Sequence, residues 1–163
     1  MPIFLSKSVK ETQQIVTNWI AKIKNFKVDE AIVVALEGEL GAGKTIFVKA
    51  AAKALGVKKR VKSPTFTLIK QYNIVLSKSS KVNSSIGRTE VSNIKFLYHL
   101  DCYRLKDEND LINLGMKEIL TQSHNIMFIE WSDRVKKILP KKHIKIHIDH
   151  TDKHTRKLRI SGV

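Results

Sequence analysis

The chain has 163 residues, of which 42% are apolar and 28% are charged, so it is long enough for one domain (residues 1–163) and too apolar for wholesale disorder. The chain has a single cysteine, Cys102, which excludes a disulfide framework within the chain. No apolar run approaches the roughly 18 residues that span a bilayer, and this predicts a cytoplasmic protein without membrane contact. The net charge of +15 indicates either a polyanionic partner such as nucleic acid or merely a lysine-rich composition, because 24 of the 30 basic residues are lysine.

The N-terminal third of the chain predicts a helix, a strand and a second helix. Ser8 and Glu11 have the spacing of a capping box, and apolar residues then recur at helical spacing. Trp19 lies on this apolar face and is expected in the core. The run "AIVVAL" (residues 31–36) is rich in β-branched residues and is typical of a strand buried on both faces. A second helix is expected over residues 45–55.

The remainder of the chain predicts further strands, one helix and a long loop. The expected strands are residues 66–74, 95–100, 126–130 and 143–148. A helix is expected over residues 107–120, although Gly115 weakens it. Residues 76–93 are polar and serine-rich, which predicts a mobile loop insertion. Strands interleaved with helices indicate an α/β fold with a mostly parallel central sheet flanked by helices.

The turn after the first predicted strand carries a phosphate-binding pattern. The sequence "GELGAGKT" matches GxxxxGKS/T in full, with a strand before it and a helix after it. Glycines let backbone amides wrap phosphates at a helix N-terminus, Lys44 supplies positive charge, and Thr45 offers a hydroxyl to Mg²⁺. The pattern therefore predicts a site for Mg²⁺ and ATP. Its binding residues are Gly38, Glu39, Leu40, Gly41, Ala42, Gly43, Lys44, Thr45 and Ile46.

Two carboxylates end apolar strands elsewhere in the chain. Asp101 follows "KFLYHL", and Glu130 closes "IMFIE" in the manner of a Walker B strand. In phosphate-loop enzymes the metal and the attacking water need such groups at the ends of neighbouring strands. We therefore expect both carboxylates to act near Mg²⁺ or the attacking water, with capping of a turn as the alternative for either one alone.

The motifs that are missing narrow the class of nucleotide-binding protein. The guanine-specific N/TKxD motif and an ABC-type signature are absent from the sequence. A kinase of this fold usually needs an arginine-rich lid, whereas the six arginines here are not clustered. A small-molecule kinase and a nucleotide-gated RNA-binding module remain as alternatives to an ATPase.

Four segments together resemble one protein family. "GELGAGKT", "VKSPTFTL", "HLDCYRL" and "FIEW" occur in the order found in the bacterial TsaE (YjeE) proteins, and the resemblance runs from the N-terminal helix to about Arg159. That family supplies the ATPase of tRNA threonylcarbamoyladenosine synthesis. The resemblance implies a P-loop fold with a C-terminal β-hairpin. It also implies ATP and Mg²⁺ as cofactors, weak ATP hydrolysis, and action with the TsaD–TsaB complex, through which tRNA is met.

The resemblance also implies roles for individual residues. Ser63 and Thr65 would belong to a switch-like loop, with Thr65 near the γ-phosphate and among the catalytic residues beside Asp101 and Glu130. Trp131 would lie close to the nucleotide. Arg156 would approach the nucleotide from the C-terminal hairpin, and the segment "KET" (residues 10–12) would lie near the base.

The sequence departs from the family pattern at two places. The family often has a second threonine after the Lys-Thr pair, and Ile46 stands there instead, so one hydroxyl contact is lost. The loop over residues 76–93 is longer than the family usually has, which predicts a tolerated surface insertion or altered partner contacts.

Overall fold

The computed structural model describes residues 2–24, 26, 28–75, 93–105 and 109–162. The expected loop over residues 76–93 lies outside this part of the chain except for Asn93. Seven strands form one sheet in the order β1-β7-β6-β2-β5-β4-β3. The strands are β1 (Ile3–Ser6), β2 (Ile32–Glu37), β3 (Ile69–Asn73), β4 (Phe96–Asp101), β5 (Asn125–Glu130), β6 (Ile144–His150) and β7 (Arg156–Ser161).

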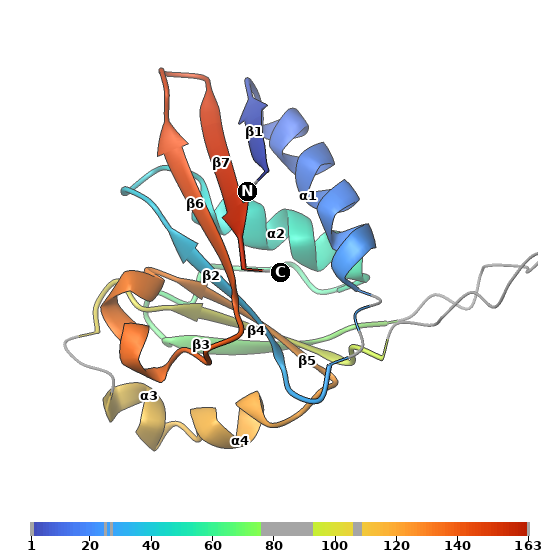
Figure 1. Ribbon diagram of the computed structural model, residues 1–163, viewed down its shortest axis with the longest axis vertical. Helices are drawn as coiled ribbons and strands as arrows, with labels where there is room; N and C mark the ends of the chain where they lie inside the picture. Colours follow the sequence, from blue (N-terminus) through green and yellow to red (C-terminus); the bar gives the residue numbers. More distant parts are fainter. Residues whose placement is uncertain (1, 25, 27, 76–92, 106–108, 163) are drawn as a thin grey trace, which may run out of the picture.

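Helices cover both faces of this sheet (Figure 1). They are α1 (Val9–Ile23), α2 (Lys44–Leu55), α3 (Asn109–Asn113), α4 (Met116–Leu120) and the 3-10 segment η1 (Ser132–Ile138). The apolar sides of α1 and α2 pack on one face, and those of α3, α4 and η1 pack on the other. Within the described ranges, no helix has the length and apolar character that crossing a bilayer requires.

The sheet is parallel at its centre and antiparallel at its edges. Strand β2 pairs in parallel with β5 and β6, and β4 pairs in parallel with β5. Strand β3 runs antiparallel to β4, and β6, β7 and β1 form successive antiparallel pairs. The predicted α/β P-loop class and the C-terminal β-hairpin (β6 and β7) are therefore confirmed, while the sheet as a whole is mixed. Strand β1 was not predicted, because the sequence "IFLS" shows no alternation of apolar and polar residues, although in the structure Ile3 and Leu5 are exposed while Phe4 and Ser6 face inward.

Two predicted elements differ from the structure. The strand expected over residues 66–74 begins only at Ile69, because the amides of Thr67 and Leu68 both bond to the carbonyl of Pro64 and close a turn. Leu68 has a φ of 62°, which strands do not use. The helix expected over residues 107–120 is two short helices, since Gly115 adopts a φ of 74° between them and breaks the hydrogen-bond pattern.

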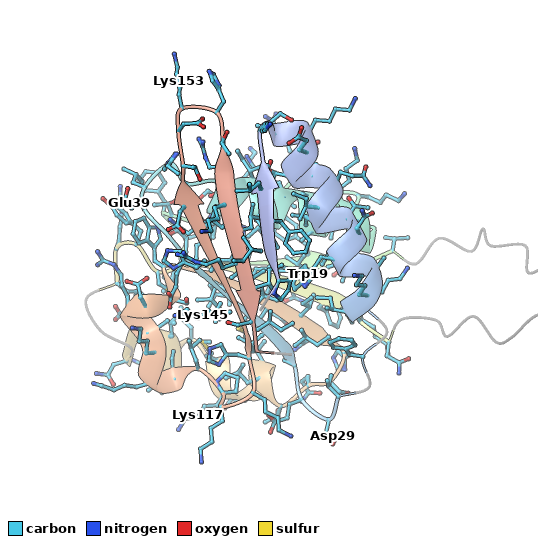
Figure 2. The ribbon with its side chains drawn as sticks, turned by 45° about the horizontal axis from the view of Figure 1, so that its top comes forward. Trp19, Asp29, Glu39, Lys117, Lys145 and Lys153 are labelled. Carbon is cyan, nitrogen blue, oxygen red and sulfur yellow. The ribbon has the colours of Figure 1, made fainter. Side chains whose placement is uncertain are left out.

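The first core forms where α1 and α2 meet the sheet. The side chain of Trp19 points inward from α1 (Figure 2) and meets Phe47 of α2 edge to face, with ring centroids 5.5 Å apart. Phe47 in turn contacts Phe128 of β5. The capping box predicted at Ser8 is formed, because the amide of Glu11 donates to its Oγ. The expected placement of Trp19 in the core is thus confirmed.

The register of the central strands brings the two predicted carboxylates to the same edge of the sheet. Asp101 of β4 is paired with Glu130 of β5, and Glu130 is paired on its other side with Leu36 of β2. The phosphate-loop pattern begins two residues after Leu36. The carboxyl ends of parallel strands are the usual place for ligand sites in α/β sheets, and the phosphate-loop pattern, Asp101 and Glu130 all lie there.

Candidate nucleotide-binding site

The loop over residues 38–43 connects β2 to α2 and requires glycine at specific positions. Gly38 has a φ of 136°, and a Cβ built there would lie 2.2 Å from the backbone oxygen of Ile148 in β6. Gly43 has a φ of 109° and no heavy atom within 4 Å of such a Cβ. The first glycine therefore permits close contact with the neighbouring strand. The second leaves open space at the N-terminus of α2, where backbone amides bind anions.

Lys44, the first residue of α2, folds back over this loop. Its Nζ donates to the backbone oxygens of Gly38 at 2.7 Å and of Glu39 at 2.9 Å, and lies 3.7 Å from the ring centroid of Trp131. Burial lowers the pKa of the Lys44 ammonium below its ordinary value, while the carboxylates of Glu130 and Asp101 act in the opposite direction. A cation held at the mouth of an amide-rich loop is well placed for terminal phosphates.

A cavity of about 360 Å³ lies beside Lys44. This volume falls within the range of roughly 300–1,000 Å³ that is typical of small-molecule sites. The structure thus brings together residues predicted from four separate segments of the sequence. The lining residues are Leu40, Gly41, Gly43, Lys44, Thr45, Ile46, Ser63, Thr65, Asp101, Tyr103, Glu130 and Trp131.

Glu130 is held by two contacts at the base of the cavity. Its Oε2 accepts a hydrogen bond from the Thr45 hydroxyl at 2.9 Å, and its Oε1 lies 2.7 Å from Nε2 of His99. Only 3% of the Glu130 side chain is exposed. The predicted carboxylate and the predicted metal-binding hydroxyl are therefore direct neighbours.

Asp101 is bonded to the segment that carries the "SPTFT" sequence. Its Oδ2 accepts hydrogen bonds from the hydroxyls of Ser63 and Thr65, which also bond to each other at 2.7 Å. Its Oδ1 accepts from the amide of Tyr103. Asp101 thereby fixes the start of the predicted switch-like loop against the end of β4.

The oxygen groups of this site fit a magnesium ion. Thr45, Glu130 and Asp101 offer a hydroxyl and two carboxylates, the hard oxygen ligands that Mg²⁺ prefers. Among the described residues there is no group of three or more His, Cys, Asp or Glu side chains that forms a complete metal cage. In nucleotide sites Mg²⁺ is usually bound by one or two carboxylates together with phosphate oxygens and water.

Arg156 lies on the other side of the phosphate loop, in a narrower cleft of about 60 Å³. This cleft is lined by Gly41 and Ala42 from the loop, by Ile46 from α2, by Thr12 from α1 and by Arg156 from β7, among others. The guanidinium of Arg156 donates to three backbone carbonyls of the hairpin turn, those of Asp152, Lys153 and Thr155. Arg156 and Thr12 therefore both approach the loop, although they do not line the larger cavity.

Comparison with known proteins identifies the family of this chain. The model of the family described as "Threonylcarbamoyl adenosine biosynthesis protein TsaE" matches residues 6–158. The chain belongs to the TsaE family. It is 36% identical to the TsaE protein of Haemophilus influenzae over 124 residues, which are 76% of this chain and 66% of that protein. It is 33% identical to the TsaE protein of Bacillus subtilis over 147 residues, which are 90% of this chain and 80% of that protein.

A solved structure has the same fold. The crystal structure of Bacillus subtilis YdiB matches with a TM-score of 0.68 and 26% identity, covering 99% of this chain and 85% of that one. The TsaE resemblance seen in the sequence motifs is thereby confirmed in both sequence and fold.

Two residues of the site in this TsaE-family chain were not assigned a defined role from sequence. His99 contacts Glu130, and Tyr103 lines the cavity with its ring centroid 5.0 Å from that of Trp131. The signal for His99 was its spacing, because residues two apart in a strand share a face and His99 is two residues before Asp101. Cys102 is buried on the opposite face of the sheet, among the apolar residues on which α3, α4 and η1 pack.

Proposed function

We propose that this TsaE-family chain binds and hydrolyses Mg-ATP in the cytoplasm and is required for threonylcarbamoyladenosine modification of the adenosine next to the tRNA anticodon. It acts with TsaD and TsaB and is not itself the transferase. The observation that carries the proposal is the convergence of Lys44, Thr45, Asp101 and Glu130 on one cavity at the carboxyl edge of the sheet. The names of the relatives, which describe threonylcarbamoyladenosine biosynthesis, supply the pathway.

The residues predicted from the sequence to form the site each have a task in this proposal. Amides of the loop and Lys44 bind the phosphates, which the positive end of the α2 dipole also favours. Thr45 and Glu130 would hold Mg²⁺, which when bound neutralises charge that develops on the transferred phosphoryl group. Asp101 would orient the attacking water, and Thr65, which donates a hydrogen bond to Asp101, would meet the γ-phosphate. Trp131, whose ring lies against the Lys44 ammonium, would cover the phosphates.

The segment next to the cavity supports dependence on a protein partner. Phe66 follows Thr65 directly and is 86% exposed, with the guanidinium of Arg104 4.5 Å from its ring centroid. An exposed aromatic residue in a segment that also bonds a catalytic carboxylate links surface binding to the site. We therefore expect slow hydrolysis by the isolated chain and faster hydrolysis when TsaD and TsaB are bound.

The test compares the Lys44→Ala variant with a control variant, Lys49→Ala. Lys49 is an exposed lysine of the same helix. Each protein is mixed with ATP, TsaD, TsaB, tRNA and threonylcarbamoyl-adenylate, and the modified nucleoside per TsaD is counted by mass spectrometry. Wild type and Lys49→Ala are expected to support many rounds of modification, and Lys44→Ala is not. Equal yield with Lys44→Ala, or without this protein, refutes the function.

Two further measurements, of metabolite-dependent ATP consumption and of tRNA binding, separate the two alternatives. A small-molecule kinase would consume ATP only with a metabolite and would release a phosphorylated product. A nucleotide-gated RNA-binding module would bind tRNA tightly by itself, with affinity that falls steeply with salt, and would release little phosphate.

A further inference from the structure

His99 is a buried histidine at the edge of the proposed ATP site. It lies in β4, adjacent to β5 in the sheet (Figure 1), and its side chain is 0% exposed. On the face of β4 that packs toward α2, Leu97 belongs to the core and Asp101 lines the cavity. His99 stands between them and does not line the cavity. It is therefore placed to act on the site through another residue.

The only polar contact that the described residues give to the His99 ring is with Glu130. Nε2 lies 2.7 Å from Oε1 of Glu130, whereas the buried Nδ1 has no hydrogen-bond partner among the residues that the structure describes. An ionised carboxylate only accepts hydrogen bonds, so the proton of this contact lies on Nε2. Leaving Nδ1 unpaired in the interior costs stability. An apolar side chain would fill the same space without that cost, so stability alone does not explain a histidine at this position.

The contact has a geometric consequence for Glu130. With Oε1 held by His99, the other oxygen, Oε2, faces the hydroxyl of Thr45 at 2.9 Å. The carboxylate is thus fixed at both ends, and rotation about its last bond would break one contact or the other. Preorganised oxygens bind a metal ion more tightly than freely rotating ones, because no order has to be imposed on binding.

We propose that His99 is a positioning residue, which donates Nε2–H to Oε1 of Glu130 and so presents Oε2 toward Thr45 and the metal of bound Mg-ATP. This inference rests on the proposed function, since it assigns to Glu130 and Thr45 the role of holding Mg²⁺. It adds a residue outside the cavity that controls the metal response without touching the nucleotide.

The test uses two amide variants that differ by one methylene group. The amide nitrogen of His99→Gln reaches the place of Nε2 and keeps the donor to Glu130, whereas that of His99→Asn is too short and ends near the place of Nδ1. Affinity for ATP is measured by calorimetry in EDTA and across a Mg²⁺ titration. Thermal unfolding is recorded for each protein.

We expect all three proteins to bind ATP in EDTA within about twofold of each other, because His99 does not contact the nucleotide. The Mg²⁺ concentration that gives half of the maximal change in ATP affinity is expected to rise about tenfold or more in His99→Asn, as for other residues that orient metal ligands. In His99→Gln this concentration is expected to stay within about threefold of the wild-type value. A role in folding alone would lower thermal stability and leave the Mg²⁺ response unchanged.

A second measurement uses the wild-type protein and needs no variant to fold. In protein labelled with ¹⁵N-histidine, the Nε2 proton of His99 is expected to be visible and protected from solvent, and to shift when Mg²⁺ is added to the ATP-bound protein. An unchanged Mg²⁺ response in folded His99→Asn, or a His99 signal that ignores Mg²⁺, overturns the inference. Wild-type protein that binds no ATP, or binds it equally with and without Mg²⁺, overturns the proposed function itself.

Discussion

The two outer glycines of the phosphate loop allow stability to be separated from ligand binding. We predict that Gly38→Ala destabilises the fold more than Gly43→Ala does. Both positions have positive φ, so a side chain strains the backbone at either by roughly 1–3 kcal/mol. Only at Gly38 does the new Cβ also meet a fixed group, because it would lie 2.2 Å from the backbone oxygen of Ile148.

The size of the difference follows from that one contact. Overpacking against structure that cannot move costs roughly 1–3 kcal/mol. The strain common to the two variants cancels to first order, so Gly38→Ala is expected to be less stable than Gly43→Ala by about this amount. For a chain of this length the melting temperatures should then differ by roughly 2–12 °C.

Urea unfolding followed by circular dichroism measures the free energy of unfolding of each variant. Calorimetry with Mg-ATP measures the affinity of each variant for the nucleotide. Gly43 lines the cavity, so a methyl group there is expected to weaken ATP binding at least about tenfold in a folded protein. Equal loss of stability in both variants would refute the argument from Ile148. Unchanged ATP affinity in Gly43→Ala would show that phosphates do not bind at this loop.

Three further predictions address the carboxylate, the tryptophans and the cysteine. The Asp101→Asn variant is expected to bind ATP within about threefold of wild type, whereas its rate of phosphate release in the presence of TsaD and TsaB falls at least about a hundredfold. The reason is that the carboxylate acts on the transition state. Phosphate release by the variant at the wild-type rate would contradict this. Mg-ATP is expected to change the fluorescence of Trp19→Phe protein and to leave Trp131→Phe nearly silent, since only Trp131 lines the cavity; the reverse result would place the nucleotide elsewhere. Burial, with the charge of Asp101 nearby, raises the pKa of Cys102 to about 12, so at pH 8 roughly one thiol in ten thousand is ionised. Alkylation of Cys102 is therefore expected only after unfolding in urea. Labelling of the folded protein at the rate of a free thiol would contradict the burial.

Local patterns in the sequence were sufficient to predict the centre of the fold. The phosphate loop is one continuous segment between a buried strand and a helix, and its conformation depends on its own glycines and on the adjacent helix N-terminus. The strands ending at Asp101 and Glu130 were predicted from apolar runs of the parallel type. Because parallel strands end at a common edge, the meeting of these carboxylates beside the loop followed from the pattern as well.

Other features depended on contacts that no local pattern contains. The turn that shortens β3 is closed locally by two amides that donate to Pro64, but it is held in place by Asp101, which bonds Ser63 and Thr65 from 38 and 36 positions away and donates its amide to Leu68. Strand β1 exists because β7 offers it an edge, and the register of that pair is set by residues more than 150 positions apart, such as Ile3 and Arg159. Propensity within a short window carries no information about such partners.

The sequence by itself determined the α/β class, the phosphate loop with Lys44 and Thr45, and the carboxylates that follow the central strands. Only the tertiary structure decided which of their atoms meet. Thr45 and Glu130 are 85 positions apart and touch because β5 pairs with β2, the strand that leads into the phosphate loop and α2. His99 and Glu130 are 31 positions apart and touch because β4 pairs with β5 in one register. A shift of that register by one residue would turn each side chain to the opposite face of the sheet. Register depends on the packing of both faces at once, and for this reason the hydrogen bonds of Glu130 could be seen only in the folded chain.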